Sequence, residues 1–405
     1  MKKILLAISF MLMLFQQNIF AQETFKLSGQ LRPRLDFDNK DFSGDTKVST
    51  YTTLRSRLGV QFMPSKDVNG FIQIQDGRMF GTESSPTANT ANVDLHQAYF
   101  EIKDFFSLPV DVKVGRMEAS YGNERLFGVS DWGTTGRSLD GFLMKLKTNS
   151  FDLEFLGFQE IEKSLPDDYE DMYVLAVHGD IKFASGYKVM PFIIWQRKLP
   201  SEILDRYTLG MYVKGDVFGF THETEFSYQL GSITPATQKM DISAFLVAFN
   251  AGYTFNEVLK PTISAGIDYL SGDDNSDDDK YKVFNTLYGT GHKYLGYMDY
   301  FTNIPKDTDE KGIMDLHLKF SMNPFENFKV AFAGHLFNAA QEMSLADGTK
   351  SKDFGFESDL TLNYKYSNNV SLQGGASLFS PGDIFKETKG EDTSSWIYLM
   401  AVVNF

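Results

Sequence analysis

The chain has 405 residues, with 53 Asp and Glu against 39 Lys and Arg and a formal net charge of −14. This acidic balance excludes the broad basic surface that nucleic-acid binding requires, so we expect no nucleic-acid partner. The sequence contains no cysteine, which excludes disulfides, thiolate metal sites and a lipid anchor on cysteine.

The N-terminus has the pattern of a secretory signal peptide. Lys2 and Lys3 precede an apolar run over 4–15, and a polar stretch then leads to Ala21. This pattern predicts a signal peptide over 1–21 and a mature chain over 22–405. The apolar run is too short for a membrane-spanning helix, and no later segment approaches eighteen consecutive apolar residues. An exported chain without a spanning helix is expected in the outer membrane.

Alternation of apolar and polar residues with period 2 recurs from Thr24 to the C-terminus. It predicts eighteen strands, an even number, as closure of an antiparallel bacterial barrel requires. The predicted strands are 24–37, 48–63, 70–78, 93–104, 109–117, 138–148, 150–159, 170–184, 186–197, 205–216, 217–230, 240–255, 260–271, 311–322, 326–338, 352–367, 369–379 and 394–405. The predicted fold is all-β: a closed antiparallel transmembrane β-barrel of about 18 strands.

Short turns, such as 148–149 and 367–369, alternate with longer connections, of which the largest is 272–310. Short periplasmic turns and long outer loops place both termini in the periplasm. The parity of the predicted strands separates their two faces. Leu54 and Leu58 share one face, whereas Arg55 and Arg57 share the other. Because a charge facing lipid costs about 2–4 kcal/mol at the midplane, the arginine face is expected to line the lumen. A soluble β-sandwich with one wet face is the alternative.

The aromatic content and the last strand also favour a barrel in a membrane. The chain has 37 Phe and 19 Tyr, which suit the girdles at both membrane interfaces. Ile397, Leu399 and Phe405 lie on one strand face, and the sequence closes on the aromatic residue. This strand resembles the terminal strand of bacterial outer-membrane proteins. The resemblance implies recognition by the barrel-assembly machinery and contact with outer-membrane lipid and lipopolysaccharide.

The arginines are unevenly distributed, because all ten precede position 207 and eight lie between 32 and 137. Parity points four of them into the lumen from the first two predicted strands. The expected pore-lining residues are Arg32, Arg34, Arg55, Arg57, Gln73, Gln75, Lys113 and Lys145. A guanidinium binds a carboxylate with two parallel hydrogen bonds, so this patch predicts a selectivity ladder for carboxylated solutes. The alternative is a structural brace, in which the arginines pair with the inward carboxylates of Asp36, Glu101 and Glu154.

Arg116 departs from the pattern, because it shares the parity of the outward Val110, Val112 and Val114. Regular pairing would place it in lipid. A β-bulge at Gly115 that redirects the side chain, or the end of the strand, is therefore expected here.

Several segments together resemble the alginate-export outer-membrane porins. They are Val93-Asp-Leu-His-Gln-Ala-Tyr99, Gly115-Arg116, Tyr121-Gly-Asn-Glu-Arg-Leu-Phe-Gly128, Asp131-Trp132, Gly136-Arg-Ser-Leu-Asp-Gly141, Ser271-Gly-Asp273, Tyr288-Gly-Thr-Gly-His292 and Tyr294-Leu-Gly-Tyr-Met-Asp299. The resemblance spans nearly the whole mature chain. It implies an eighteen-stranded monomeric barrel whose constricted, arginine-rich pore passes an anionic uronate polymer outward. By matching position, it also implies that Arg116, Arg125, Arg137 and Asp140 belong to the constriction and its loop.

Two other classes of function are alternatives to a channel of the alginate-export type. One is a general or small-anion diffusion porin for nutrient uptake, and the other is an enzyme or structural barrel with a closed lumen. Asp315 and His317 share an inward face, but no G-x-S-x-G motif accompanies them, so we expect no enzyme and no cofactor.

The segment from Asp273 to Asp279 is strongly acidic. Its potential Ca²⁺ ligands are Asp273, Asn275, Asp277 and Asp279. The segment lacks the glycine and terminal glutamate of an EF-hand loop, so a solvated outer loop is the favoured interpretation and a Ca²⁺ site the alternative. The six histidines show no metal-binding spacing, and no other metal site is predicted.

Overall fold

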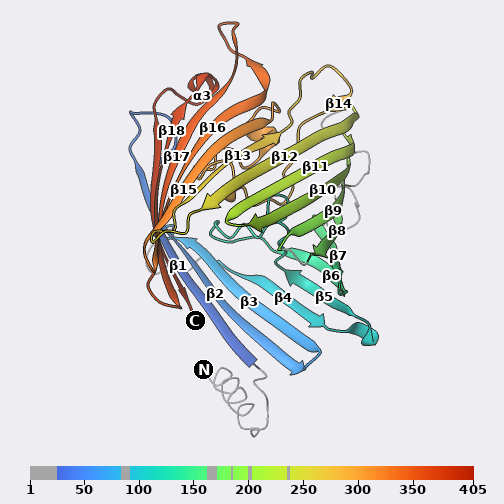
Figure 1. Ribbon diagram of the computed structural model, residues 1–405. Helices are drawn as coiled ribbons and strands as arrows, with labels where there is room; N and C mark the ends of the chain where they lie inside the picture. Colours follow the sequence, from blue (N-terminus) through green and yellow to red (C-terminus); the bar gives the residue numbers. More distant parts are fainter. Residues whose placement is uncertain (1–24, 84–91, 162–170, 184–185, 199–202, 235–237) are drawn as a thin grey trace.

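The computed structural model describes residues 25–83, 92–161, 171–183, 186–198, 203–234 and 238–405. The predicted signal peptide lies outside the described residues. Over the described residues the chain forms one sheet that closes on itself, because β1 pairs with the last strand, β19, from Gln30 opposite Asn404 to Asn39 opposite Ser395. Figure 1 shows the resulting barrel.

Eighteen strands build the barrel wall, each antiparallel to its neighbours in chain order. They are β1 (Phe25–Asn39), β2 (Ser49–Ser65), β3 (Val68–Met79), β4 (Val93–Ile102), β5 (Val110–Met117), β6 (Leu139–Lys147), β7 (Phe151–Ile161), β8 (Met172–Lys182), β9 (Lys188–Lys198), β10 (Leu204–Val217), β11 (Phe220–Ile233), β12 (Met240–Thr254), β13 (Thr262–Leu270), β15 (Ile313–Phe325), β16 (Phe328–Ser344), β17 (Lys350–Lys365), β18 (Val370–Pro381) and β19 (Ser394–Asn404). The predicted number and order of strands are confirmed.

The connections alternate in length as predicted. Two-residue turns, such as 66–67, 218–219 and 326–327, lie at the end of the barrel where β1 begins and β19 ends. The opposite end carries the long loops, among them 118–138 and 271–312. The short elements outside the wall are η2 (Phe105–Ser107), β14 (Lys280–Tyr281), η3 (Gly291–Lys293), α2 (Ile304–Asp307) and α3 (Asp383–Thr388). None of the described helices has the length and hydropathy needed to cross a membrane.

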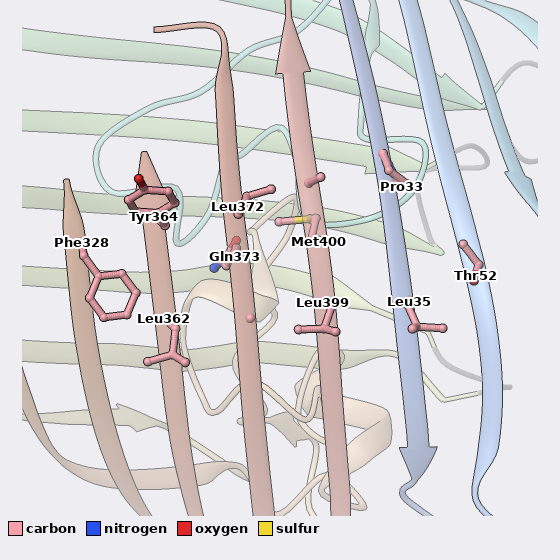
Figure 2. Close-up of a pocket in the computed structure, with 12 residues that line it drawn as sticks. Pro33, Leu35, Thr52, Phe328, Leu362, Tyr364, Leu372, Gln373, Leu399 and Met400 are labelled. Carbon is pink, nitrogen blue, oxygen red and sulfur yellow. The ribbon is translucent and has the colours of Figure 1, made fainter. Parts of the chain in front are cut away.

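The outer side of the wall is apolar, as the parity argument predicted. Leu58 and Leu360 are exposed on it, whereas Arg55 and Asp359 on the same strands are almost fully buried on the lumen side. Figure 2 shows a stretch of this outer wall, where apolar side chains such as Leu399 border a shallow groove beside Gly374. An apolar exterior around a polar, buried interior requires lipid outside, because contact between water and such a large apolar surface is unfavourable.

The buried apolar core lies inside the barrel. Loop 118–138 enters the lumen, and its Leu126 and Phe127 pack in one cluster with Tyr288 of loop 271–312. The wall contributes inward Leu156, Ile194, Ala244 and Leu246 to the same cluster. Figure 1 shows the loop after β5, in teal, within the outline of the barrel. The lumen therefore contains two packed loops in addition to the polar side chains that the sequence predicts there.

Candidate functional site

Four arginines meet on the lumen side of β1 and β2. The register of this pair sets Arg32 directly opposite Arg55, and Gln30 opposite Arg57. Arg34 lies two residues from Arg32 on the same face. Arg32 and Arg55 are 6% and 1% exposed, so these two side chains are buried. The structure thus brings the four side chains together on neighbouring strands, and we call these residues the arginine patch.

The arginine patch binds loop 118–138 through the loop's backbone and through Asp131. Arg32 donates to the carbonyl oxygens of Asp131, Trp132 and Gly133, the last from Nη2 at 2.6 Å. Arg55 donates from Nη1 to the Asp131 carbonyl at 2.9 Å, and its Nη2 lies 2.8 Å from Asp131 Oδ1. Arg57 Nη1 lies 3.3 Å from the same carboxylate oxygen. A single loop carboxylate thus bridges two guanidinium groups.

The brace interpretation is correct only in part. Arg34 Nε donates to Asp36 Oδ2 at 3.0 Å, as that interpretation predicts. The other two expected carboxylates serve different partners: Glu154 accepts from Lys145 at 2.7 Å, and Glu101 lies opposite Lys113. The arginines were expected to pair with wall residues alone, but a loop distant in sequence supplies most of their acceptors.

Trp132 packs between the arginine patch and loop 271–312. The Arg34 guanidinium lies 4.7 Å from the centre of the Trp132 ring, a cation–π arrangement. On loop 271–312, the His292 ring stacks on Trp132 with centroids 4.0 Å apart. Trp132 therefore links the cationic wall to the second loop of the lumen.

The opposite wall of the lumen is acidic. Glu225 on β11 and Asp268 on β13 are both buried, and Arg125 of loop 118–138 reaches them. Arg125 Nη1 donates to Asp268 Oδ2 at 2.7 Å, and its Nε lies 3.7 Å from Glu225. Burial alone would lower the pKa of the Arg125 guanidinium, but these carboxylates outweigh it and raise the pKa, so Arg125 stays charged. Loop 118–138 thus crosses the lumen with a carboxylate at one wall and a guanidinium at the other.

Arg137 joins the two loops to one another. Its Nη1 donates to the carbonyl oxygens of Gly128, at 2.8 Å, and Tyr288. The loops also share backbone hydrogen bonds, such as Gly128 N to Tyr288 O at 2.9 Å. Arg125 and Arg137, which the family resemblance places at the constriction, therefore hold the loops of the lumen in place.

The remaining predicted pore residues line the wall beside the arginine patch. Gln75 accepts from Arg57 Nε at 2.7 Å, and Gln73 accepts from the Gln97 amide at 3.2 Å. The Lys113 ammonium lies 4.6 Å from the centre of the Tyr99 ring. Each of these side chains occupies the lumen face that parity predicted.

Arg116 and Asp140 correct two expectations. The pairing of β5 with β4 and β6 is continuous across Gly115, so the first of the two expected explanations, a bulge, is wrong; the strand ends at Met117, one residue past Arg116. Arg116 keeps the parity of the exposed Val114 and forms an ion pair with Asp140, which is directly opposite and shares a face with the exposed Phe142. The two side chains therefore lie on the outer side of the wall and do not line the pore. Their mutual neutralisation removes the need for a bulge.

Sequence reasoning missed the role of Asp131 and Glu118, both of which contact Arg57. Asp131 belongs to the Asp131-Trp132 segment that resembles the alginate-export porins, but no periodic signal in the sequence indicates that this loop folds inward. The acidic outer segment gives little support to the Ca²⁺ alternative, because Asp273 accepts from the backbone of Asn275 and Lys282 pairs with Asp274 and Asp278. Within the described residues, the group of side chains that could hold a metal ion is elsewhere: Asp315, His317 and His335.

Comparison with solved structures places this architecture among outer-membrane porins. The fold is similar to OccK8 (OprE) of Pseudomonas aeruginosa, with a TM-score of 0.60 at 12% identity over 95% of this chain and 98% of that one. It is likewise similar to OccD3 (OpdP) of P. aeruginosa, with a TM-score of 0.63 at 12% identity over 95% and 91%. The structure of P. aeruginosa OpdK with vanillate gives a TM-score of 0.61 at 11% identity over 94% and 98%. No curated protein sequence matches the chain significantly.

The protein is thus an outer-membrane β-barrel with an apolar exterior that faces the lipid of that membrane, and it shares the fold of these porins. The family model described as alginate export matches residues 24–398, which is nearly the whole chain. The chain belongs to the alginate export family.

Proposed function

We propose that this channel passes solutes that carry carboxylates, and that its main cargo is an anionic polysaccharide of the uronate class. The observation that carries the proposal is the carboxylate of Asp131, which bridges Arg55 and Arg57 while its side chain stays 54% exposed. It occupies the position that a uronate carboxylate would take, and it does so where water and solute can reach it.

The charge balance of the arginine patch supports the same proposal. Three of its four arginines have a carboxylate within 4 Å, whereas Arg32 is bound through backbone carbonyls. Carbonyl oxygens satisfy the donors of a guanidinium without cancelling its charge. The patch therefore keeps excess positive charge, which attracts anions, and guanidinium groups hold carboxylates with two parallel hydrogen bonds. An incoming carboxylate would compete with Asp131 for Arg55 and Arg57 and so loosen loop 118–138.

A diffusion porin for small anions is the second candidate. Two observations favour it: the two loops packed in the lumen reduce the space for a polymer, and OpdK, a structurally similar channel, was solved with vanillate, a small carboxylate. A passive pore has no direction of its own, so export and uptake share the same residues. The family and the fold favour both candidates over an enzyme.

We also propose that export removes residues 1–21 and that the barrel-assembly machinery recognises the last strand through Phe405. The backbone of Phe405 exchanges two hydrogen bonds with Gly29, at 2.7 and 3.0 Å, so this residue completes the seam between β19 and β1. Lipopolysaccharide is the expected partner of the outer end. Deletion of Phe405 should lower the yield of folded barrel in cells, whereas an unchanged yield would contradict this role.

Conductance across a planar bilayer tests the transport proposal. We expect an anion-selective channel that oligouronates of several residues block at lower concentration than vanillate or other monomeric acids do. Block by monomeric acids alone would favour the diffusion porin. A folded barrel without conductance, or a cation-selective one, would contradict both candidates.

A further inference from the structure

The wall formed by β15, β16 and β17 holds a buried cluster of histidine and carboxylate side chains outside the arginine patch. Asp315 and His317 share the lumen face of β15, and His335 lies directly opposite His317 on β16. Asp315 is fully buried, and His335 and His317 are 2% and 8% exposed. We propose that these three side chains bind a divalent transition-metal ion such as Zn²⁺.

The donor atoms converge on one point. Asp315 Oδ2 lies 2.8 Å from His335 Nδ1 and 3.3 Å from His317 Nδ1. One ligand atom from each of the three residues lies within 4.8 Å of the others. Tetrahedral Zn²⁺ with bonds of about 2.0–2.1 Å separates its ligand atoms by roughly 3.3 Å, so small side-chain rotations would bring all three into coordination.

The cluster also leaves a buried acceptor unused. Asp315 Oδ1 has no hydrogen-bond partner, although the side chain is fully buried. A buried carboxylate oxygen without a partner is costly, and a cation is the kind of ligand that would satisfy it. Asp268, directly opposite on β13, pairs with Arg125 and does not contact the free oxygen of Asp315.

A carboxylate lies beside the ring of one proposed ligand, at an ion-pair distance that a small rotation would shorten to a hydrogen bond. His335 Nε2, the nitrogen not directed at Asp315, lies 4.0 Å from Asp359 Oδ2, a second buried oxygen without a hydrogen-bond partner. Metal-bound histidines usually donate their other ring N–H to a carboxylate, which fixes the ring. Gly266, opposite His317, leaves room for the second ring, because a Cβ there would lie 2.4 Å from His317 Nε2.

The chemistry of the donors defines the class of ion. Two imidazole nitrogens and one carboxylate suit Zn²⁺ and other first-row divalent ions better than Ca²⁺ or Mg²⁺, which prefer oxygen. Three protein ligands leave a coordination position for water. The sequence did not indicate the site, because the second histidine comes from the neighbouring strand and no local spacing connects it with the Asp-x-His pair.

Metal titration of the full barrel, folded in detergent and stripped with EDTA, tests the proposal. We expect saturable Zn²⁺ binding by calorimetry and, with Co²⁺ as the probe, a visible d–d absorption band that Zn²⁺ removes. His317→Ala and His335→Ala should abolish the band, and Asp359→Asn should weaken binding by about 10–100-fold. His222→Ala is the control: this histidine shares the outer face of β11 with the exposed Phe220 and Phe226, away from the cluster, and the variant should bind as the wild type does.

Heat-dependent gel mobility verifies that each variant is folded. If His335→Ala fails to fold, the milder Asp359→Asn carries the test, because it leaves all three ligands in place. A folded wild-type barrel that gives no Co²⁺ band overturns the proposal and leaves a hydrogen-bonded Asp–His network. Equal loss of binding in His222→Ala also overturns it, because the ion would then bind non-specifically.

Discussion

Arg125 and Asp268 form a buried ion pair at 2.7 Å although 143 residues separate them in the chain. The pair fastens loop 118–138 to the acidic wall, while Asp131 on the same loop binds the arginine patch at the other wall. The loop therefore spans the lumen between two contacts of opposite polarity. Any solute that passes must displace one of these contacts or move beside the loop.

The buried end of this loop should matter most for stability. Arg125→Met removes the cation and leaves Asp268 and Glu225 as buried unpaired carboxylates, which should cost about 3–5 kcal/mol of unfolding free energy. Guanidinium unfolding followed by tryptophan fluorescence measures this loss. Combining the change with Asp268→Asn should recover part of it, since a neutral amide tolerates burial better. If the losses of the two single variants simply add in the double variant, the two residues are not coupled.

The exposed end of the loop should instead control permeation. Asp131→Asn removes the carboxylate that bridges Arg55 and Arg57 and leaves the backbone contacts in place. The arginine patch then carries more net positive charge, so conductance and anion selectivity should both rise, as measured by reversal potential in a salt gradient. Asp140→Asn, on the outer side of the wall, is the control and should leave selectivity unchanged. Unchanged selectivity in Asp131→Asn would show that this carboxylate does not limit anion entry.

Charge reversal in the arginine patch tests whether it selects ions. Replacing Arg55 and Arg57 together by glutamate should reverse or abolish anion preference, because inward charges set pore selectivity. Replacement of both by lysine keeps the charge but loses the two-bond geometry. It should preserve selectivity for simple anions and weaken block by oligouronates. Wild-type selectivity in a folded double-glutamate variant would mean that these arginines serve only to hold loop 118–138.

The close approach of the two lumen loops predicts a steric effect at Gly289. A Cβ at this position would lie 2.3 Å from the backbone oxygen of Arg125, so no side-chain rotation can relieve the clash. Gly289→Ala should separate the loops, lower stability by about 1–3 kcal/mol and increase current noise through the channel. Gly334→Ala, whose Cβ would meet its nearest atom at an ordinary 3.4 Å, is the matched control. Equal stability of the two variants would contradict this close packing of the two lumen loops.

The sequence by itself determined the wall of this protein. Alternation with period 2 is a local property, and the membrane imposes it on every strand, since a charge facing lipid is costly. Eighteen strands, their order and the inward direction of Arg32, Arg34, Arg55 and Arg57 could therefore be predicted from neighbouring residues alone. Departures at strand ends, such as β16 reaching Ser344 where 338 was expected, occur where a hairpin leaves the periodic part of the wall.

The tertiary structure decided what fills the lumen. Whether a loop folds inward depends on contacts that exist only after closure brings β1, β13 and β16 around one lumen, and no local period encodes them. Asp131 at the arginine patch, Arg125 at Asp268, and His335 beside Asp315 each join residues from distant segments or separate strands. The same holds for Arg116, because its neutralising partner Asp140 can be identified only when the register of β5 and β6 is known. The face of the wall that a side chain occupies is thus a local property of the sequence, whereas charge pairing across the lumen is a property of the closed barrel.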